Sequence, residues 1–170
     1  MASEIYDFIV IGTGPAGLAA AMTAAKAEKK VLVVEKEGSL GGVCVNTGTF
    51  PSKTLREAVL HLTGHLKRKL YEDASCASMD AEISMEKLKQ RLYHVRTEEH
   101  LIINCQLERN GIALIRGNAR FFDSNTVIID QLGTNQKIRV QGERIIIATG
   151  SQPRNPPEFP FDHQVIVDST

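Results

Sequence analysis

The sequence predicts an α/β fold in which a parallel sheet is built on an N-terminal βαβ unit. Three observations lead to this fold: a mainly apolar run over residues 5–11, an alanine-rich helical pattern over residues 15–28, and a second apolar run over residues 31–35. Two apolar strands joined by one helix are typical of parallel neighbours with a right-handed crossover. Further along the chain the apolar period changes to two, which predicts an antiparallel β-meander beside the parallel sheet.

Three glycines stand between the first apolar run and the helical pattern. Gly12, Gly14 and Gly17 have the spacing of the G-x-G-x-x-G turn of Rossmann-like domains, and the flanking strands and helix are those that this turn requires. Gly12 allows the tight turn, Gly14 admits a pyrophosphate next to the backbone, and Gly17 lets the helix pack closely on the strand. The sequence therefore predicts a dinucleotide at the start of this helix, where unpaired N–H groups attract phosphate.

An acidic residue, Glu35, closes the second apolar run. A carboxylate at this position accepts hydrogen bonds from the two hydroxyls of an adenosine ribose and repels a 2′-phosphate, so FAD or NAD is expected rather than NADP. Pro15 suits the first helical turn, where its missing N–H costs nothing. Ala16 and Lys36 are also expected to bind the nucleotide. The alternative is a glycine-rich turn followed by a surface glutamate.

Composition excludes several other classes of protein. The 170 residues suffice for one domain, or for one domain and a fragment. Lys plus Arg and Asp plus Glu each number 20, so no net charge favours nucleic acid or an anionic membrane. No apolar run approaches the ~20 residues that span a bilayer, and the N-terminus does not resemble a signal peptide. Cys44, Cys76 and Cys105 form no C-x-x-C or zinc pattern, so we expect a cytoplasmic protein without a bound metal.

Two helical patterns follow the βαβ unit, and short strands follow the helices. The first pattern covers residues 44–70, with a bend or restart at Pro51. The second covers residues 83–108 and is ended by Gly111. Short strands are then expected at residues 112–115, 119–122, 126–129, 137–140 and 144–147. His61 and His65 are spaced to share a helix face, but without a third ligand an exposed pair is the better interpretation.

One run of residues resembles a known family. Residues 41–53 read Gly-Gly-Val-Cys-Val-Asn-Thr-Gly-Thr-Phe-Pro-Ser-Lys. This run resembles the G-G-x-C-x-N-x-G-C-x-P-S-K run of the flavoprotein disulfide reductases with two dinucleotide-binding domains, the group of dihydrolipoamide dehydrogenase, glutathione reductase and mercuric reductase. Cys44 matches the first of the two flavin-facing cysteines, and Thr49 stands at the second. Because a threonine hydroxyl forms no disulfide, the dithiol relay of that family cannot operate here.

The loss of that cysteine points to one branch of the family. The chain is most similar to the soluble, Si-specific NAD(P)+ transhydrogenases, which keep the fold without the redox disulfide. The likeness includes Gly117–Phe121 and Ile147–Ser151, whereas Val43 stands where the branch commonly has glycine. The resemblance implies FAD as the cofactor, hydride transfer between NADPH and NAD+ as substrates, and a homo-oligomer when full length.

The resemblance also implies roles for individual residues. Nine are expected to bind FAD in addition to those named for the glycine turn: Gly41, Gly42, Val43, Cys44, Lys53, Ala119, Ala148, Thr149 and Gly150. Lys53 reaches the flavin N5 edge, where a cation stabilises negative charge on the reduced ring; the alternative is an exposed helix lysine. Cys44 packs against the flavin rather than acting in redox chemistry, and Ala119 meets the adenine through its backbone. For Gly150 the alternative is a turn that ends a strand.

Domain organisation follows from the same resemblance. Residues 1–151 are expected to form the N-terminal part of an FAD-binding domain, and residues 152–170 a proline-rich linker with the entry strand, at 165–167, of an NAD(P)-binding domain that this chain lacks. Three functions stay open: the transhydrogenase; another flavin reductase of the fold, dihydrolipoamide-dehydrogenase-like or quinone-reducing; and a non-catalytic nucleotide-binding fragment.

Overall fold

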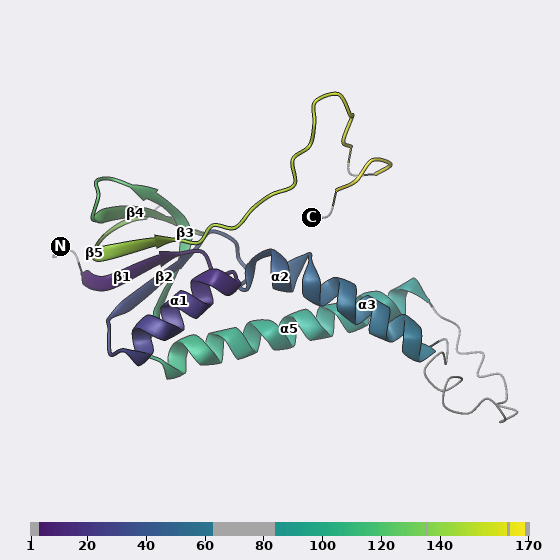
Figure 1. Cartoon of the computed structure of the whole chain (residues 1–170), viewed down its shortest axis with the longest axis horizontal. Coiled ribbons are helices and arrows are strands. Elements are labelled where there is room, and N and C mark those ends of the chain that lie inside the picture. The colour runs from purple at the N-terminus through teal and green to yellow at the C-terminus, as the bar shows by residue number, and fades with distance from the viewer. Residues whose placement is uncertain (1–3, 63–83, 135, 163, 169–170) are drawn as a thin grey trace, which may run out of the picture.

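The computed structural model describes residues 4–62, 84–134, 136–162 and 164–168. It contains five strands and four helices among these residues (Figure 1). In chain order they are β1 (Ile5–Ile11), α1 (Pro15–Lys26), β2 (Val31–Glu35), α2 (Gly42–Asn46), α3 (Thr49–Leu62), α5 (Met85–Arg109), β3 (Ala113–Phe121), β4 (Thr126–Gln131) and β5 (Lys137–Ile147). The βαβ unit has the expected strand bounds, and α1 ends two residues earlier than the pattern predicts.

The strands form one closed sheet with parallel and antiparallel parts. β1 pairs in parallel with β2 and with β5, and β2 pairs in parallel with β3. β4 then pairs antiparallel with both β3 and β5, which closes the five strands into a barrel. The mixed α/β fold with parallel and antiparallel strands is therefore confirmed, whereas the sequence did not predict closure.

The five short strands expected after residue 111 are in fact three longer ones. The runs at 112–115 and 119–122 join into β3, and those at 137–140 and 144–147 join into β5. Each long strand passes from the parallel part to the meander, and a glycine lies near the point of transfer. A Cβ on Gly117 would lie 2.5 Å from the carbonyl oxygen of Asp130, and one on Gly142 would lie 2.8 Å from a side-chain carbon of Ile9. These glycines permit close approach within continuous strands, so they do not end the strands.

The first long helical pattern is divided in two. The chain leaves the helix at Thr47 and Gly48, whose N–H groups both donate to the carbonyl oxygen of Val43 at 3.1 and 2.7 Å. The restart expected at Pro51 lies at Thr49 instead, so that Pro51 falls in the first turn of α3, where a missing N–H is tolerated. The part of this prediction beyond residue 62, together with His65 and Cys76, lies outside the described residues.

The other helix boundaries agree closely with the sequence. α5 runs over 25 residues from Met85, and its N-cap is Ser84, whose hydroxyl accepts a hydrogen bond from the N–H of Lys87 at 3.3 Å. It ends before Gly111, which has φ 64° and donates its N–H to Glu108. The short strand expected at residues 165–167 is wrong: the described residues there form bends, and the segment after β5 leads away from the barrel (Figure 1).

The buried side chains form two clusters, one on each face of the parallel strands. Successive residues of β1 point to opposite faces: Val10 packs in the cluster with α1 and α5, and Ile9 packs in the barrel interior. The helix-side cluster includes Ala21 of α1 and Leu107 of α5, and these two helices cover the same face of the sheet (Figure 1). The two clusters cover both faces of the parallel strands. The carboxyl ends of these strands are left as the place for a site.

Candidate dinucleotide site

The parallel strands end in register at one edge of the sheet. Ile11 of β1 pairs with Val34 of β2 and with Ile147 of β5, and Val34 pairs in turn with Ile115 of β3. The residues that follow this row include Gly12, Glu35 and Ala148. The fold therefore brings these sequence-predicted residues together at the carboxyl ends of neighbouring parallel strands.

Gly12 and Gly17 are required for packing at this edge. Gly12 has φ 106°, and a Cβ there would lie 2.3 Å from the carbonyl oxygen of Ala148. Gly17 is buried, and a Cβ there would lie 2.0 Å from the carbonyl oxygen of Gly12. Ala148 itself donates its N–H to Ile11 at 2.9 Å. Strand β1, helix α1 and the end of β5 therefore meet with no space for a side chain.

Gly14 differs from its neighbours because it faces open space. It is the N-cap of α1, with φ −62° and ψ 173°, and no side chain caps the helix. A Cβ there would meet nothing within 4 Å. Pro15 and Ala16 follow and are exposed. The first turn of α1 thus presents backbone N–H groups and the positive end of the helix dipole to a space that a phosphate can enter.

The second glycine pair lies against the first loop. Gly41 and Gly42 both have positive φ, 89° and 58°, and a Cβ on Gly42 would lie 3.0 Å from the Cα of Gly14. A Cβ on Gly41 would lie 2.4 Å from a side-chain carbon of Val45, so this position too has space only for glycine. The loop before α2 is therefore adjacent to the start of α1, as a site for one extended cofactor requires.

Glu35 is buried at the same edge, with 5% of its surface exposed. Its Oε2 accepts a hydrogen bond from the N–H of Thr13 at 2.9 Å and a second from the Thr13 hydroxyl. Its Oε1 accepts from the N–H of Glu37 at 2.9 Å. Three donors thus stabilise the carboxylate in one orientation, which is the usual requirement for a buried charge.

A second set of hydrogen bonds links the loop at Leu40–Gly42 to α5 through Asn46 and His100. The Asn46 side-chain amide donates to the carbonyl oxygens of Leu40 and Gly42, each at 2.9 Å. Its Oδ1 lies 3.0 Å from Nε2 of His100. Because that amide oxygen only accepts, His100 must donate through Nε2. Burial, together with the charges of Arg96 and Arg116, lowers the pKa of His100.

The residues expected at the flavin lie on α2 and α3. Cys44 is half-buried on α2, whereas Thr49 is exposed at the first position of α3. Lys53 is exposed one turn later on α3, and no described residue pairs with its ammonium group. Val43 is 48% exposed on α2. The three residues Cys44, Thr49 and Lys53 thus lie within one short stretch that begins beside the glycine loops.

The remaining sequence-predicted residues lie outside the two glycine loops. Ala119 lies beyond it, in the part of β3 that pairs with β4, opposite Ile129. Thr149 and Gly150 follow β5 and are exposed, and Gly150 has φ 75° with open space around its Cα. Lys36 is exposed, and its ammonium lies 3.6 Å from the carboxylate of Glu37.

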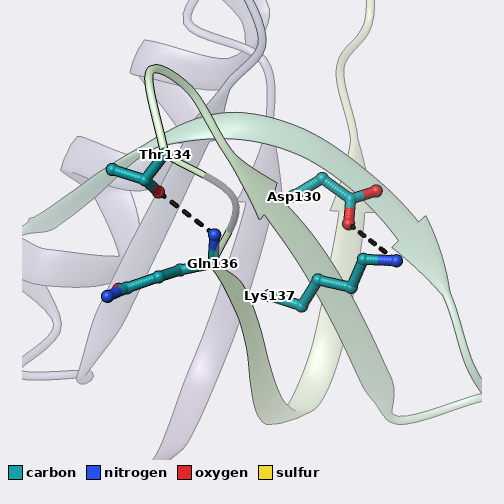
Figure 2. A pocket seen from close by; sticks show the side chains of 4 residues that line it. All are labelled: Asp130, Thr134, Gln136 and Lys137. Carbon is teal, nitrogen blue, oxygen red and sulfur yellow. Dashed lines mark hydrogen bonds and ion pairs between the residues drawn. The ribbon is translucent and has the colours of Figure 1, made fainter.

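A separate hollow lies in the meander and contains none of the predicted site residues. Asp130, Thr134, Gln136 and Lys137 line it at the β4–β5 connection (Figure 2). The Gln136 N–H donates to the Thr134 hydroxyl at 3.3 Å, and the Asp130 carboxylate lies 3.8 Å from the Lys137 ammonium. These pairs hold the turn together. The hollow is lined only by residues of that hairpin, so it does not belong to the dinucleotide site.

The described part of the chain shows neither a metal-binding cluster nor a membrane-spanning helix. No cluster of three or more His, Cys, Asp or Glu side chains suited to a metal ion occurs among the described residues. No described helix combines the length and the apolar composition needed to cross a membrane.

The glycine turn, the buried acid and the second glycine pair can be compared with known families. A sequence profile of the family described as pyridine nucleotide-disulphide oxidoreductase matches residues 6–169. The chain belongs to this family. FAD is the cofactor that membership supports. The open space at Gly14 and the adjacent Gly41–Gly42 loop fit a long dinucleotide.

Two relatives of this chain, from different organisms, carry the same name. The chain is 47% identical over 164 residues to a soluble pyridine nucleotide transhydrogenase of Mycobacterium bovis, a match that covers 96% of this chain and 35% of the relative. It is 37% identical to the protein of that name from Hahella chejuensis, covering 99% of this chain and 36% of the relative. The chain therefore spans about a third of the length of the relatives it matches.

Sequence reasoning missed three residues at this site. Thr13 is the polar residue between the first two glycines, and the structure shows that it is fully buried. Asn46 lies in the run at residues 41–53, but the sequence pattern indicates no contact for its side chain. His100 lies 54 positions from Asn46, and no local pattern relates the two. A polar residue between the first two glycines is a signal that could have singled out Thr13.

Proposed function

We propose that this chain is the FAD-binding part of an enzyme that transfers hydride between NADPH and NAD+. The observation that carries the proposal is Thr49, which stands where the family's second redox cysteine is expected, five residues after Cys44. Without a thiol pair there is no disulfide through which electrons can pass to a dithiol substrate. The name shared by the relatives, soluble pyridine nucleotide transhydrogenase, supports nicotinamide nucleotides as both donor and acceptor.

The proposed FAD contacts follow from the arrangement at the sheet edge. The first turn of α1 offers N–H groups to the pyrophosphate, next to the open face of Gly14. Gly41 and Gly42 lie where a long cofactor passes from that turn towards α2. Glu35 accepts hydrogen bonding from the hydroxyls of the adenosine ribose, and the backbone of Ala119 meets the adenine. Bound FAD supplies the hydride chemistry of the enzyme.

The side chains on α2 and α3 tune and shape the flavin site. Lys53 is exposed and without a partner in the described part of the chain, so its ammonium group is available to stabilise negative charge at the flavin N5 edge. Cys44 packs beside the flavin as a small apolar residue. Val43 and Thr49 line the same segment, and Ala148, Thr149 and Gly150 close the site from the end of β5.

The larger organisation is proposed on the same basis. Residues 1–151 form part of the FAD-binding domain, and residues 152–170 link it to an NAD(P)-binding domain of the longer protein. The full-length enzyme is a homo-oligomer in the cytoplasm. Size-exclusion chromatography with light scattering and cell fractionation test these two points.

The function is tested on the intact protein with NADPH and thio-NAD+. Reduction of thio-NAD+ is followed by the absorbance of thio-NADH, which is distinct from that of NADPH. We expect thio-NAD+ reduction that depends on FAD and on NADPH. A parallel reaction with a disulfide, lipoamide, should consume no NADH. Turnover of lipoamide, or reduction of a quinone in place of thio-NAD+, would instead identify another flavin reductase of the same fold.

A further inference from the structure

We propose that Thr13 is a positioning residue that orients Glu35, so that this carboxylate binds one ribose hydroxyl of the cofactor rather than two. The proposal rests on the proposed function, because it concerns the FAD contact of the same site. Thr13 is fully buried, and its side chain contacts two segments that approach the site from different parts of the chain.

The Thr13 hydroxyl is used both as a donor and as an acceptor. Its oxygen accepts a hydrogen bond from the N–H of Gly41 at 3.0 Å, and its proton goes to Oε2 of Glu35. An ionised carboxylate only accepts and a backbone N–H only donates, so a hydroxyl can serve both at once. Thr13 therefore links the end of β2 to the loop before α2, at the point where both approach the glycine turn.

The bonds already made limit what Glu35 can still accept. Oε2 accepts from the N–H and the hydroxyl of Thr13, and within the described ranges of the chain Oε1 accepts only from the N–H of Glu37. A carboxylate offers about four acceptor sites, roughly two on each oxygen. The remaining capacity is thus at Oε1, which has a place for one further donor. The ribose of FAD has two hydroxyls, so one of them binds Glu35 and the other does not.

Substitution of Thr13 distinguishes positioning from simple packing. Thr13→Val keeps the shape and removes the hydroxyl, whereas Thr13→Ser keeps the hydroxyl. Thr126→Val is the matched control, because Thr126 is also buried, at 1% exposure, but lies on β4 in the meander. The FAD dissociation constant of each intact protein is measured by flavin fluorescence, with FAD and with analogues that carry 2′-deoxyadenosine or 3′-deoxyadenosine.

We expect wild type to bind one deoxy analogue as tightly as FAD and the other about tenfold more weakly, the loss of one hydrogen bond to a charged group. Thr13→Val should weaken the binding of FAD by about tenfold. It should weaken the binding of the sensitive analogue, the one that wild type binds more weakly than FAD, by a smaller factor. Thr13→Ser and Thr126→Val should bind FAD as wild type does.

Two results would overturn the proposal. Equal weakening of both deoxy analogues in wild type would mean that Glu35 binds both hydroxyls. If Thr13→Val weakens the binding of FAD and of the sensitive analogue by the same factor, Thr13 only supports packing. If Thr13→Val does not fold, the analogue series on wild type and the recovery in Thr13→Ser still decide. Absence of FAD binding in wild type would overturn the proposed function itself, which is a separate outcome.

Discussion

Replacement of Gly17 by alanine should destabilise the fold before any cofactor is considered. The new Cβ would lie 2.0 Å from the carbonyl oxygen of Gly12, and ordinary contact begins at 3.4 Å. Relief of this overlap requires α1 to move away from β1 by about 1.4 Å, the difference between the two distances. Overpacking of this kind costs about 1–3 kcal/mol. The overlap of 1.4 Å with a backbone atom places the cost in the upper half of that range, about 2–3 kcal/mol. The better helix propensity of alanine recovers up to about 1 kcal/mol, so a net loss of about 1–2 kcal/mol is expected.

The assay is urea unfolding of the cofactor-free intact protein, followed by circular dichroism. Gly38→Ala is the matched control, because Gly38 is exposed in a loop and a Cβ there would meet nothing within 4 Å. The urea midpoint of Gly17→Ala should fall clearly below that of wild type. The unfolding free energies of wild type and of Gly38→Ala should agree within about 0.5 kcal/mol. If Gly17→Ala and Gly38→Ala unfold at the same urea concentration, the close packing of α1 on β1 is not as the structure has it.

Four further predictions concern single side chains. Gly14→Ala places a methyl group in the open space at the start of α1 and should weaken FAD binding by about ten- to a hundredfold in a fluorescence titration; unchanged affinity would contradict the proposed pyrophosphate position. Burial and the hydrogen bond to Glu4 raise the pKa of Tyr6 to about 12, so the stability it contributes is present below pH ~10 and lost towards pH ~12; the difference in phenolate absorbance between wild type and Tyr6→Phe checks this. Because the pKa of His100 is lowered, stability should fall as the pH drops below about 6.5, and His100→Gln should flatten that dependence in urea unfolding. Lys53→Met should slow flavin reduction by NADPH roughly ten- to a hundredfold and lower the flavin midpoint potential, with partial recovery in Lys53→Arg.

The sequence could predict the βαβ unit because each of its signals is local. The strand bounds of β1 and β2 follow from two apolar runs, and Gly12 and Gly17 identify the turn between β1 and α1. The steric reason for Gly17 is then visible in its short distance to Gly12. Local signals also placed the end of α5, where Gly111 adopts a positive φ.

The barrel could not be predicted, because its closure depends on pairing between distant residues. The strands expected at 112–115 and 119–122, and those expected at 137–140 and 144–147, leave gaps that contain Gly117 and Gly142. In the structure they are positions where two backbones or a backbone and the Ile9 side chain come close, and the strands continue through them. A glycine in a strand has both meanings, and only the tertiary structure distinguishes them.

The site shows the same division between local and distant signals. The glycine turn and Glu35 could be recognised from spacing alone. The hydrogen bonds of Thr13 join residues 22 and 28 positions apart, and that of His100 joins residues 54 positions apart. No sequence pattern specifies such contacts, because the folded sheet edge brings the segments together.

The most direct test of the account is the identity and amount of flavin bound by the intact protein. The protein is saturated with FAD, freed of excess by gel filtration and denatured, and the released flavin is identified by chromatography and counted per chain. We predict one FAD per chain in wild type and a clear loss in Gly14→Ala. Protein that stays colourless after incubation with FAD would contradict the claim that the turn at Gly12–Gly17 binds the pyrophosphate of FAD.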